Sequence, residues 1–151
     1  MVKLMQKPLW EMQAIPGKLL TDPTEEITRQ IFYKELFKET KSGRKPKRLT
    51  DTEGFVITAR DRDFKHIFLK GGVFQVDRAE RIYLIRETIL RAKYVIIDKD
   101  DRKRFHLLQP YSISGLVESF CVITERAGRA GRIVTAFPVE WERVNAFLQQ
   151  K

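Results

Sequence analysis

Cysteine and histidine are scarce in this chain, which narrows the chemistry that it can carry. Cys121 is the only cysteine among 151 residues, so an internal disulfide framework and a cysteine-rich zinc site are excluded. The two histidines, His66 and His106, stand far apart in the sequence, with no carboxylates around them at metal-ligand spacing. We therefore expect neither a metal site nor a cofactor.

Long apolar runs are also missing. No stretch approaches the roughly 18 apolar residues that a membrane-spanning helix needs, and the segment Met1–Lys7 lacks the apolar core of a secretory signal. The glycine motifs of Walker loops, dinucleotide-binding folds and serine hydrolases do not occur. We expect a cytoplasmic protein without a membrane partner.

Positive charge, in contrast, is abundant. The chain has 29 Lys and Arg against 20 Asp and Glu, a formal net charge of +9, while 42% hydrophobic residues suffice for a core. A small basic domain favours a polyanionic partner, because each cation that docks on a phosphate releases a counterion. We expect a nucleic acid or a nucleotide as the partner, and a merely solvated basic surface is the alternative.

The order of periodic segments predicts an α+β fold, with helices on one face of an antiparallel sheet. A capping Asp or Thr, with Pro23 in the first turn, and an apolar stripe from Ile27 to Phe37 predict one helix that ends at 41–43. A second helix is predicted over 77–92, where Asp77 and Glu80 form a capping-box pattern. The segment 60–70 stays ambiguous. Strands are expected at 55–58, 94–97, 104–109, 116–123 and 132–137, and a short amphipathic helix, 141–148, follows Pro138.

A basic run without apolar residues separates two expected parts of the chain. It is either a solvated linker or a flexible contact for a phosphate backbone. We place the boundary there, with an N-terminal arm, helix and basic linker over 1–48 and the main domain over 49–151. The cations of the run are candidate RNA-binding residues: Arg44, Lys45, Lys47 and Arg48.

Metal-independent RNA cleavage needs a general base, a general acid and cations around the phosphorane. His66 is the stronger histidine candidate, because apolar neighbours at helical spacing would hold it beside Lys65; an ordinary surface histidine is the alternative. His106 falls on an expected strand, and alternation predicts that it is half-exposed on a sheet face.

Arginines gather at the turn of the last expected hairpin. Arg126, Arg129 and Arg132 surround its glycines, and guanidinium groups match phosphate geometry, although a solvated hairpin tip has the same composition. Tyr111, in an expected loop, is a further candidate donor to a phosphate, and packing is its alternative role.

Thr135 is the polar residue of the closing strand. Strict alternation gives it the same face as Ile133 and Phe137, opposite Arg132. If that face is core, Thr135 is a buried residue with a local hydrogen bond. If it is a cleft, the hydroxyl can donate to a phosphate oxygen.

Three short motifs, Lys65-His66-Ile67, the segment 89–96 and the hairpin end 132–138, carry a family resemblance. They resemble the phage-associated branch of the barnase, EndoU, colicin tRNase and RelE-like nuclease superfamily, over roughly residues 50–138. The resemblance implies helices followed by a four-stranded antiparallel sheet, with the N-terminal helical appendage outside the match.

The same resemblance implies a metal-independent endoribonuclease that leaves a 2′,3′-cyclic phosphate, as in phage or conflict-system toxins with a cognate immunity protein or antitoxin. The segment 71–75 departs from the family pattern and leaves the second acid–base group unassigned. A non-catalytic nucleic-acid-binding module is the alternative, and a structural or protein-interaction component of a phage is a third possibility. The expected catalytic residues are His66, Arg132, Thr135 and Arg81, and the expected RNA-binding residues outside the basic run are Lys70, Arg78, Arg129 and Tyr111.

Overall fold

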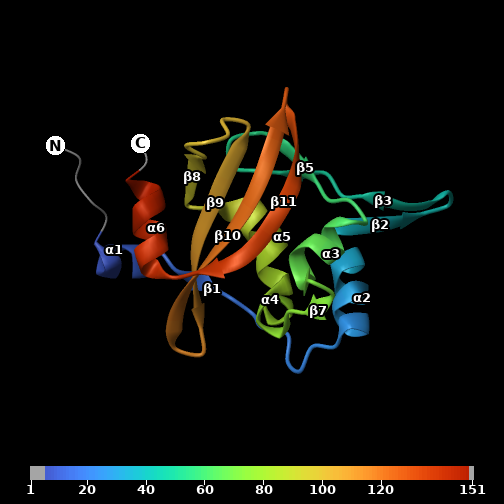
Figure 1. The fold of residues 1–151 in the computed structure, drawn as a ribbon, viewed down its shortest axis with the longest axis horizontal. Coiled ribbons are helices and arrows are strands. Elements are labelled where there is room, and N and C mark those ends of the chain that lie inside the picture. Colours follow the sequence, from blue (N-terminus) through green and yellow to red (C-terminus); the bar gives the residue numbers. More distant parts are fainter. Residues whose placement is uncertain (1–5, 150–151) are drawn as a thin grey trace.

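A seven-stranded mixed sheet with helices on both faces forms the body of the computed structural model (Figure 1). The structure describes residues 6–149. Residues 1–5, where most of the segment inspected for a secretory signal lies, and residues 150–151, the end of the expected main domain, fall outside the described part. The helices are α1 (Lys7–Glu11), α2 (Glu25–Leu36), α3 (Asp63–Phe68), α4 (Val76–Glu80), α5 (Ile82–Arg91) and α6 (Trp141–Leu148).

The middle of the sheet is the expected antiparallel meander. Around it, a strand parallel to β9, a strand parallel to β11 and one further edge strand make a mixed sheet rather than a four-stranded antiparallel one. The ten-residue β9 explains part of the difference, because the shorter β8 covers only part of its edge and β1 pairs with the rest. The strands of the sheet are β1 (Ile15–Pro16), β4 (Leu49–Thr50), β5 (Val56–Thr58), β8 (Tyr94–Ile97), β9 (Arg104–Ile113), β10 (Leu116–Ala127) and β11 (Ala130–Val139).

Helices cover both faces of this sheet, so the expectation of helices on one face was wrong. Adjacent residues of the central strands, such as Leu107 and Leu108, are both buried, as in strands that are packed on two sides. The first apolar cluster, core one, lies between the sheet and α2, α3, α4 and α5. The second, core two, contains Trp10, Leu108 and Val144 and lies under α1 and α6.

The helix predictions hold in part. The cap of α2 is Thr24, whose side chain accepts a hydrogen bond from the Ile27 amide, so the helix starts after Pro23 and not with Pro23 in its first turn. α2 also ends at Leu36, before the predicted end at 41–43, because residues 37–40 form a strand. The expected helix over 77–92 is two helices that meet at Arg81, and the capping-box prediction was wrong because α4 begins after Gln75 without a side-chain cap. No helix within residues 6–149 is long and apolar enough to cross a membrane.

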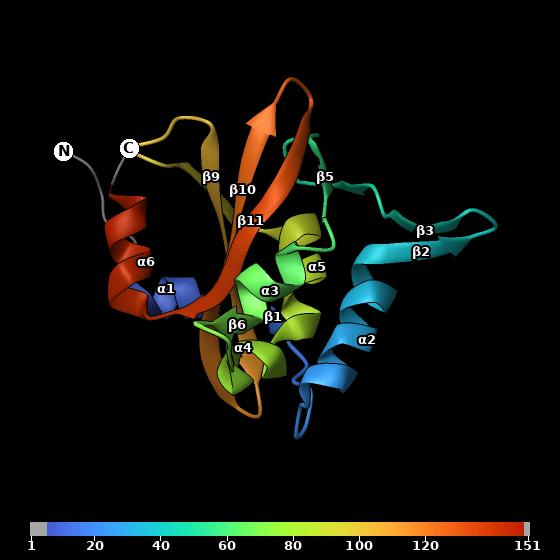
Figure 2. The same ribbon diagram turned by 45° about the vertical axis from the view of Figure 1, so that its right-hand side comes forward.

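The basic run does not form a linker. It enters a two-stranded hairpin, β2 (Phe37–Thr40) and β3 (Gly43–Pro46), which projects from the body beyond the end of α2 (Figure 2). Leu36 and Leu49, on either side of the hairpin, both pack into core one. The boundary at residue 48 stays a prediction, although one apolar cluster spans it. A second small hairpin is β6 (Leu69–Lys70) with β7 (Val73–Phe74).

A buried hydroxyl pair joins α5 to the sheet and can be tested. Thr88 Oγ1 and Tyr111 Oη are 2.7 Å apart, and both side chains are fully buried. Tyr111→Phe and Thr88→Val should each lower the free energy of unfolding by about 1 kcal/mol, because each removes the short hydrogen bond between the two buried hydroxyls; after Thr88→Val the Tyr111 hydroxyl keeps only a longer, 3.5 Å bond to the Leu84 carbonyl. The double variant should lose clearly less than the sum of the two in urea unfolding. Additive losses would show that the two hydroxyls are not coupled.

Candidate functional site

Four arginines and one histidine surround a cavity of about 300 Å³ beside the start of α3. We call it the arginine pocket. The segment before α3 forms one wall and the sheet strands β9 and β11 form the other, so residues that are distant in the sequence meet there. The pocket is lined by Arg60, Arg62, Asp63, His66, Arg104, Arg132 and Val134.

The α3 wall is held by a buried carboxylate. Asp63 is 1% exposed, and it accepts hydrogen bonds from the Arg60 backbone N–H at 2.7 Å and from Arg60 Nη2 at 2.9 Å. Phe64 and Ile67 point into core one and anchor the helix. His66 lies on the opposite, exposed side, in the wall of the pocket. The helical spacing of these residues therefore leaves its imidazole accessible.

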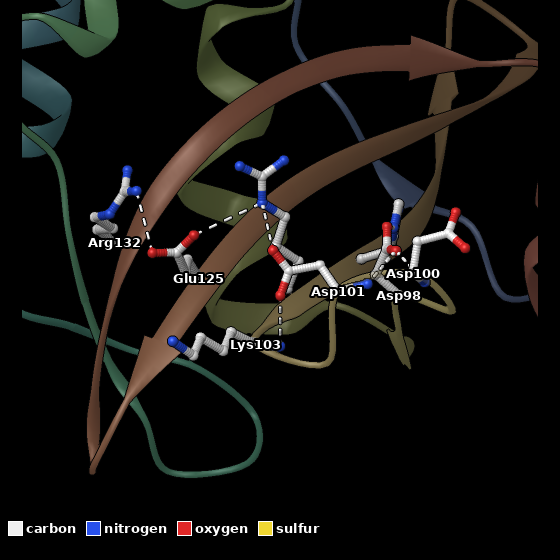
Figure 3. A network of polar contacts seen from close by, with 8 residues as sticks. Asp98, Asp100, Asp101, Lys103, Glu125 and Arg132 are labelled. Carbon is white, nitrogen blue, oxygen red and sulfur yellow. Dashed lines mark hydrogen bonds and ion pairs between the residues drawn. The ribbon is translucent and has the colours of Figure 1, made fainter.

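The sheet wall is a row of three charged residues across neighbouring strands. Glu125 on β10 pairs in register with Arg104 on β9 and with Arg132 on β11. Its carboxylate is 3.7 Å from Arg104 Nε and 3.2 Å from Arg132 Nη2. Figure 3 shows Glu125 beside Arg132, with the ionic network continuing to Asp101, which contacts Arg104 Nε at 3.5 Å.

These ion pairs engage only part of each guanidinium group. The carboxylate contacts of Arg104 use Nε, and the ion pair of Arg132 uses Nη2. Among the described residues, Arg62 has no carboxylate within 4 Å of its guanidinium nitrogens. Several N–H donors can therefore reach a bound anion, and a phosphate is the anion that planar, forked donors suit well.

A β-bulge decides where Thr135 lies. Ile123 pairs with Thr135 while Thr124 pairs with Ile133, which leaves Val134 as an extra residue on β11. Beyond the bulge the alternation is reversed, and Thr135 lies on the face of its partner Ile123, away from Ile133 and core one. The prediction that Thr135 shares a face with Ile133 was therefore wrong. Thr135 is half-buried, and Val134 rather than Thr135 lines the arginine pocket.

The structure brings together two of the four residues that the sequence singled out as catalytic, His66 and Arg132. Arg81 lies elsewhere, because it pairs with Glu118, seven residues before Glu125 and about 23 Å along β10. The bond with Glu118 also raises the pKa of Arg81.

The expected arginine cluster of the last hairpin is dispersed. Arg126 is held between the rings of Phe55 and Phe105, at 3.8 and 3.7 Å from their centroids, and faces away from the arginine pocket. Arg129 is exposed at the turn. Of the three arginines, only Arg132 lines the pocket.

The residues predicted to bind RNA lie outside the arginine pocket. Tyr111 is a core residue on β9, not a loop residue, so its hydroxyl cannot reach RNA, and burial raises its pKa. Arg78 donates to the Ile67 carbonyl at the end of α3, and Lys70 is exposed on β6. The cations of the basic run lie on or directly after the projecting hairpin: Arg44, Lys45, Lys47 and Arg48.

His106 is buried, which corrects the expectation of a half-exposed residue. α6 covers it, with the Phe147 ring 4.6 Å away; its Nε2 lies 2.8 Å from Asp98 Oδ2 and its Nδ1 lies 3.9 Å from Cys121 Sγ. This order of groups matches a cysteine–histidine–aspartate triad, but Cys121 is fully buried and burial raises the pKa of its thiol. A thiol without access and without thiolate character does not act as a nucleophile.

Arg60, Arg62 and Arg104 of the pocket wall, and Glu125 beside it, were not predicted as site residues. Arg60 and Arg62 stand in a charged run whose secondary structure was ambiguous, and a solvated turn has the same composition. Arg104 and Glu125 lie on separate strands, and only the pairing register brings them together.

Residues 6–149 contain no group of three or more His, Cys, Asp or Glu side chains placed to hold a metal ion. Comparisons of the chain with protein-family models, with curated proteins and with solved structures find no match.

The Asp98–His106 pair predicts a pH-dependent stability. The hydrogen bond with His106, helped by the Asp100 and Asp101 amides, holds the pKa of Asp98 below its ordinary value. The carboxylate therefore stabilises the fold at pH values above about 4, and this stability is lost as the pH falls through the lowered pKa. Asp98→Asn should lower the free energy of unfolding by about 1–2 kcal/mol at pH 7.

In acid the difference between Asp98→Asn and the wild type should disappear. Urea unfolding at several pH values measures it, with Asp100→Asn as the control, because Asp100 is an exposed residue of the same turn. An equal loss at all pH values would contradict an ionic role for Asp98.

Proposed function

We propose that the arginine pocket binds the phosphodiester backbone of RNA and that the protein is a metal-independent endoribonuclease. The observation that carries this proposal is the meeting of His66 with Arg132 in the wall of one cavity, together with three further arginines. Cleavage would leave a 2′,3′-cyclic phosphate and a 5′-hydroxyl.

His66 and Glu125 are the two groups near the pocket suited to proton transfer. Glu125 is an acceptor whose position is held by Arg104 and Arg132 on either side. In the proposed reaction Glu125 removes the proton of the 2′-hydroxyl, whose oxygen then attacks the phosphorus. Protonated His66 donates its proton to the departing 5′-oxygen, so that proton uptake and release balance.

The arginines stabilise the charge that develops in the reaction. The phosphorane has an extra negative charge on its non-bridging oxygens, and guanidinium donors fixed in advance stabilise it without reorganisation. Arg132 and Arg104 approach from the sheet, and Arg62 from the α3 wall. These arginines stabilise the phosphorane in place of Thr135 and Arg81, which were predicted from the sequence as catalytic residues and have no role in the proposed mechanism.

One observation favours a second function, non-catalytic binding of RNA. Glu125 contacts two lining residues but does not itself line the pocket. A carboxylate that only spaces two arginines would give phosphate binding without proton transfer. In both cases RNA is the ligand, and action in the cytoplasm is part of the proposal. A toxin role with an immunity protein or antitoxin as partner belongs to the first function alone and rests on the family resemblance.

RNA cleavage by the purified protein in EDTA tests the first function. His66→Ala should lower the cleavage rate at least about 100-fold, the usual contribution of a general acid. Lys65→Ala is the matched control, because Lys65 is the exposed neighbour on α3 and does not line the pocket. It should lower the rate less than about threefold. Intact RNA over pH 5–8, or equal rates in both variants, would refute the proposed catalysis.

Glu125→Gln separates catalysis from binding. The amide keeps the size of the side chain but accepts a proton poorly, so cleavage should fall at least about 100-fold. RNA affinity, measured by fluorescence anisotropy, should stay the same or rise, because one negative charge is removed beside two arginines. Salt-sensitive RNA binding without any cleavage by the wild type would establish the second function instead.

A further inference from the structure

A second cavity, of about 740 Å³, lies between α2 and the β2–β3 hairpin. We call it the hairpin pocket. Its wall has an aromatic part, Tyr33 and Phe37, and a charged part in which cations outnumber carboxylates. The lining residues are Glu26, Arg29, Gln30, Tyr33, Lys34, Phe37, Lys38, Glu39, Arg44 and Lys47.

A stacked pair forms a flat surface in this pocket. The Arg44 guanidinium lies 3.8 Å from the centroid of the Tyr33 ring, and its Nε contacts Glu39 at 3.1 Å. These two contacts hold the guanidinium plane in place. Nucleobases of single-stranded RNA stack on aromatic rings and on guanidinium planes of this kind.

The cations around the stack suit a phosphate chain. Lys34, Lys38 and Lys47 join the two arginines of the pocket, against the carboxylates Glu26 and Glu39. Lys47 Nζ donates to the Lys34 carbonyl, which fixes one of these charges at the end of α2. A cationic groove beside stacking surfaces is the usual arrangement for single-stranded nucleic acid.

The segment 60–64 connects the two pockets, because its residues line the arginine pocket or contact residues of the hairpin pocket. Arg60 and Arg62 line the arginine pocket, and Asp61, between them, lies beside the Tyr33 hydroxyl; desolvation and this carboxylate both raise the pKa of Tyr33. The Arg29 guanidinium, on α2, stacks 4.1 Å from the centroid of Phe64 on α3, and Phe64 directly follows Asp63 of the arginine pocket. One strand of RNA can therefore cross the segment 60–64 and contact both cavities.

We infer that the hairpin pocket is a nucleotide subsite for single-stranded RNA bound in the arginine pocket. One base stacks on the Arg44–Tyr33 pair, and the flanking phosphates contact the lysines. This inference rests on the proposed binding of RNA at the arginine pocket. It adds a second subsite and a minimum length for the substrate.

Binding of fluorescent oligoribonucleotides tests the subsite, measured by anisotropy in the His66→Ala background so that RNA stays intact. Arg44→Gln should weaken binding of an eight-nucleotide RNA about tenfold or more, while binding of a dinucleotide, which is too short to fill both pockets, stays unchanged. Lys41→Gln is the matched control, because it removes the same charge from the exposed turn of the same hairpin without lining the pocket. It should weaken binding less than threefold. Melting temperatures confirm that both variants fold.

A 2-aminopurine base in the eight-nucleotide RNA reports stacking directly. Its fluorescence should be quenched by the wild-type pocket and restored in Arg44→Gln. Equal weakening by Arg44→Gln and Lys41→Gln, without a change in quenching, would overturn the subsite while RNA binding through Arg132 persists. Loss of RNA binding at both pockets would overturn the proposed function as well. Arg44-dependent binding of an oligoglutamate peptide, with RNA binding independent of Arg44, would assign the pocket to an acidic protein and overturn the inference.

Discussion

The sheet half of the arginine pocket depends on the register between β9, β10 and β11. This register places Arg104, Glu125 and Arg132 side by side, and a slip by one residue would turn such side chains to the opposite face of the sheet. The apolar residues enforce it, because β9 and β10 bury in-register pairs on both faces: Leu107 with Val122 in core one, and Leu108 with Cys121 in core two. The geometry of the charged row thus follows from the burial of its apolar neighbours.

Arg126 connects this sheet to the other half of the pocket. Its guanidinium stacks between Phe55 and Phe105 and forms ion pairs with Asp51 and Glu53. Asp51 is buried and also accepts hydrogen bonds from the backbone N–H groups of Glu53 and Phe55. The segment that leads into β5 is therefore tied, through Arg126, to the tip of the β10–β11 hairpin. β5 in turn leads to the loop before α3. Arg126, which the sequence suggested as a phosphate-binding residue, therefore helps to position the α3 wall of the arginine pocket.

Carboxylates accompany the guanidinium groups of the arginine pocket. Glu125 stands between the guanidinium groups of Arg104 and Arg132 and reduces their mutual repulsion, and Asp63 pairs with Arg60. They leave a local excess of positive charge that a phosphate backbone can neutralise. The same arrangement recurs in the hairpin pocket, where Glu39 holds Arg44. Both cavities can thus exist in the folded protein before RNA arrives, which lowers the entropic cost of ordering side chains when RNA binds.

Much of the fold follows from local sequence. The capping signal around Pro23 and the period-two alternation from residue 104 predict that α2 and the meander exist, because each signal acts within a few residues. The sequence alone also singled out His66 and Arg132. Only the tertiary structure placed them in one cavity with Arg104, turned Thr135 at the bulge and buried His106 under α6. Those outcomes depend on strand register and on helices that pack from distant parts of the chain, and no local pattern encodes either.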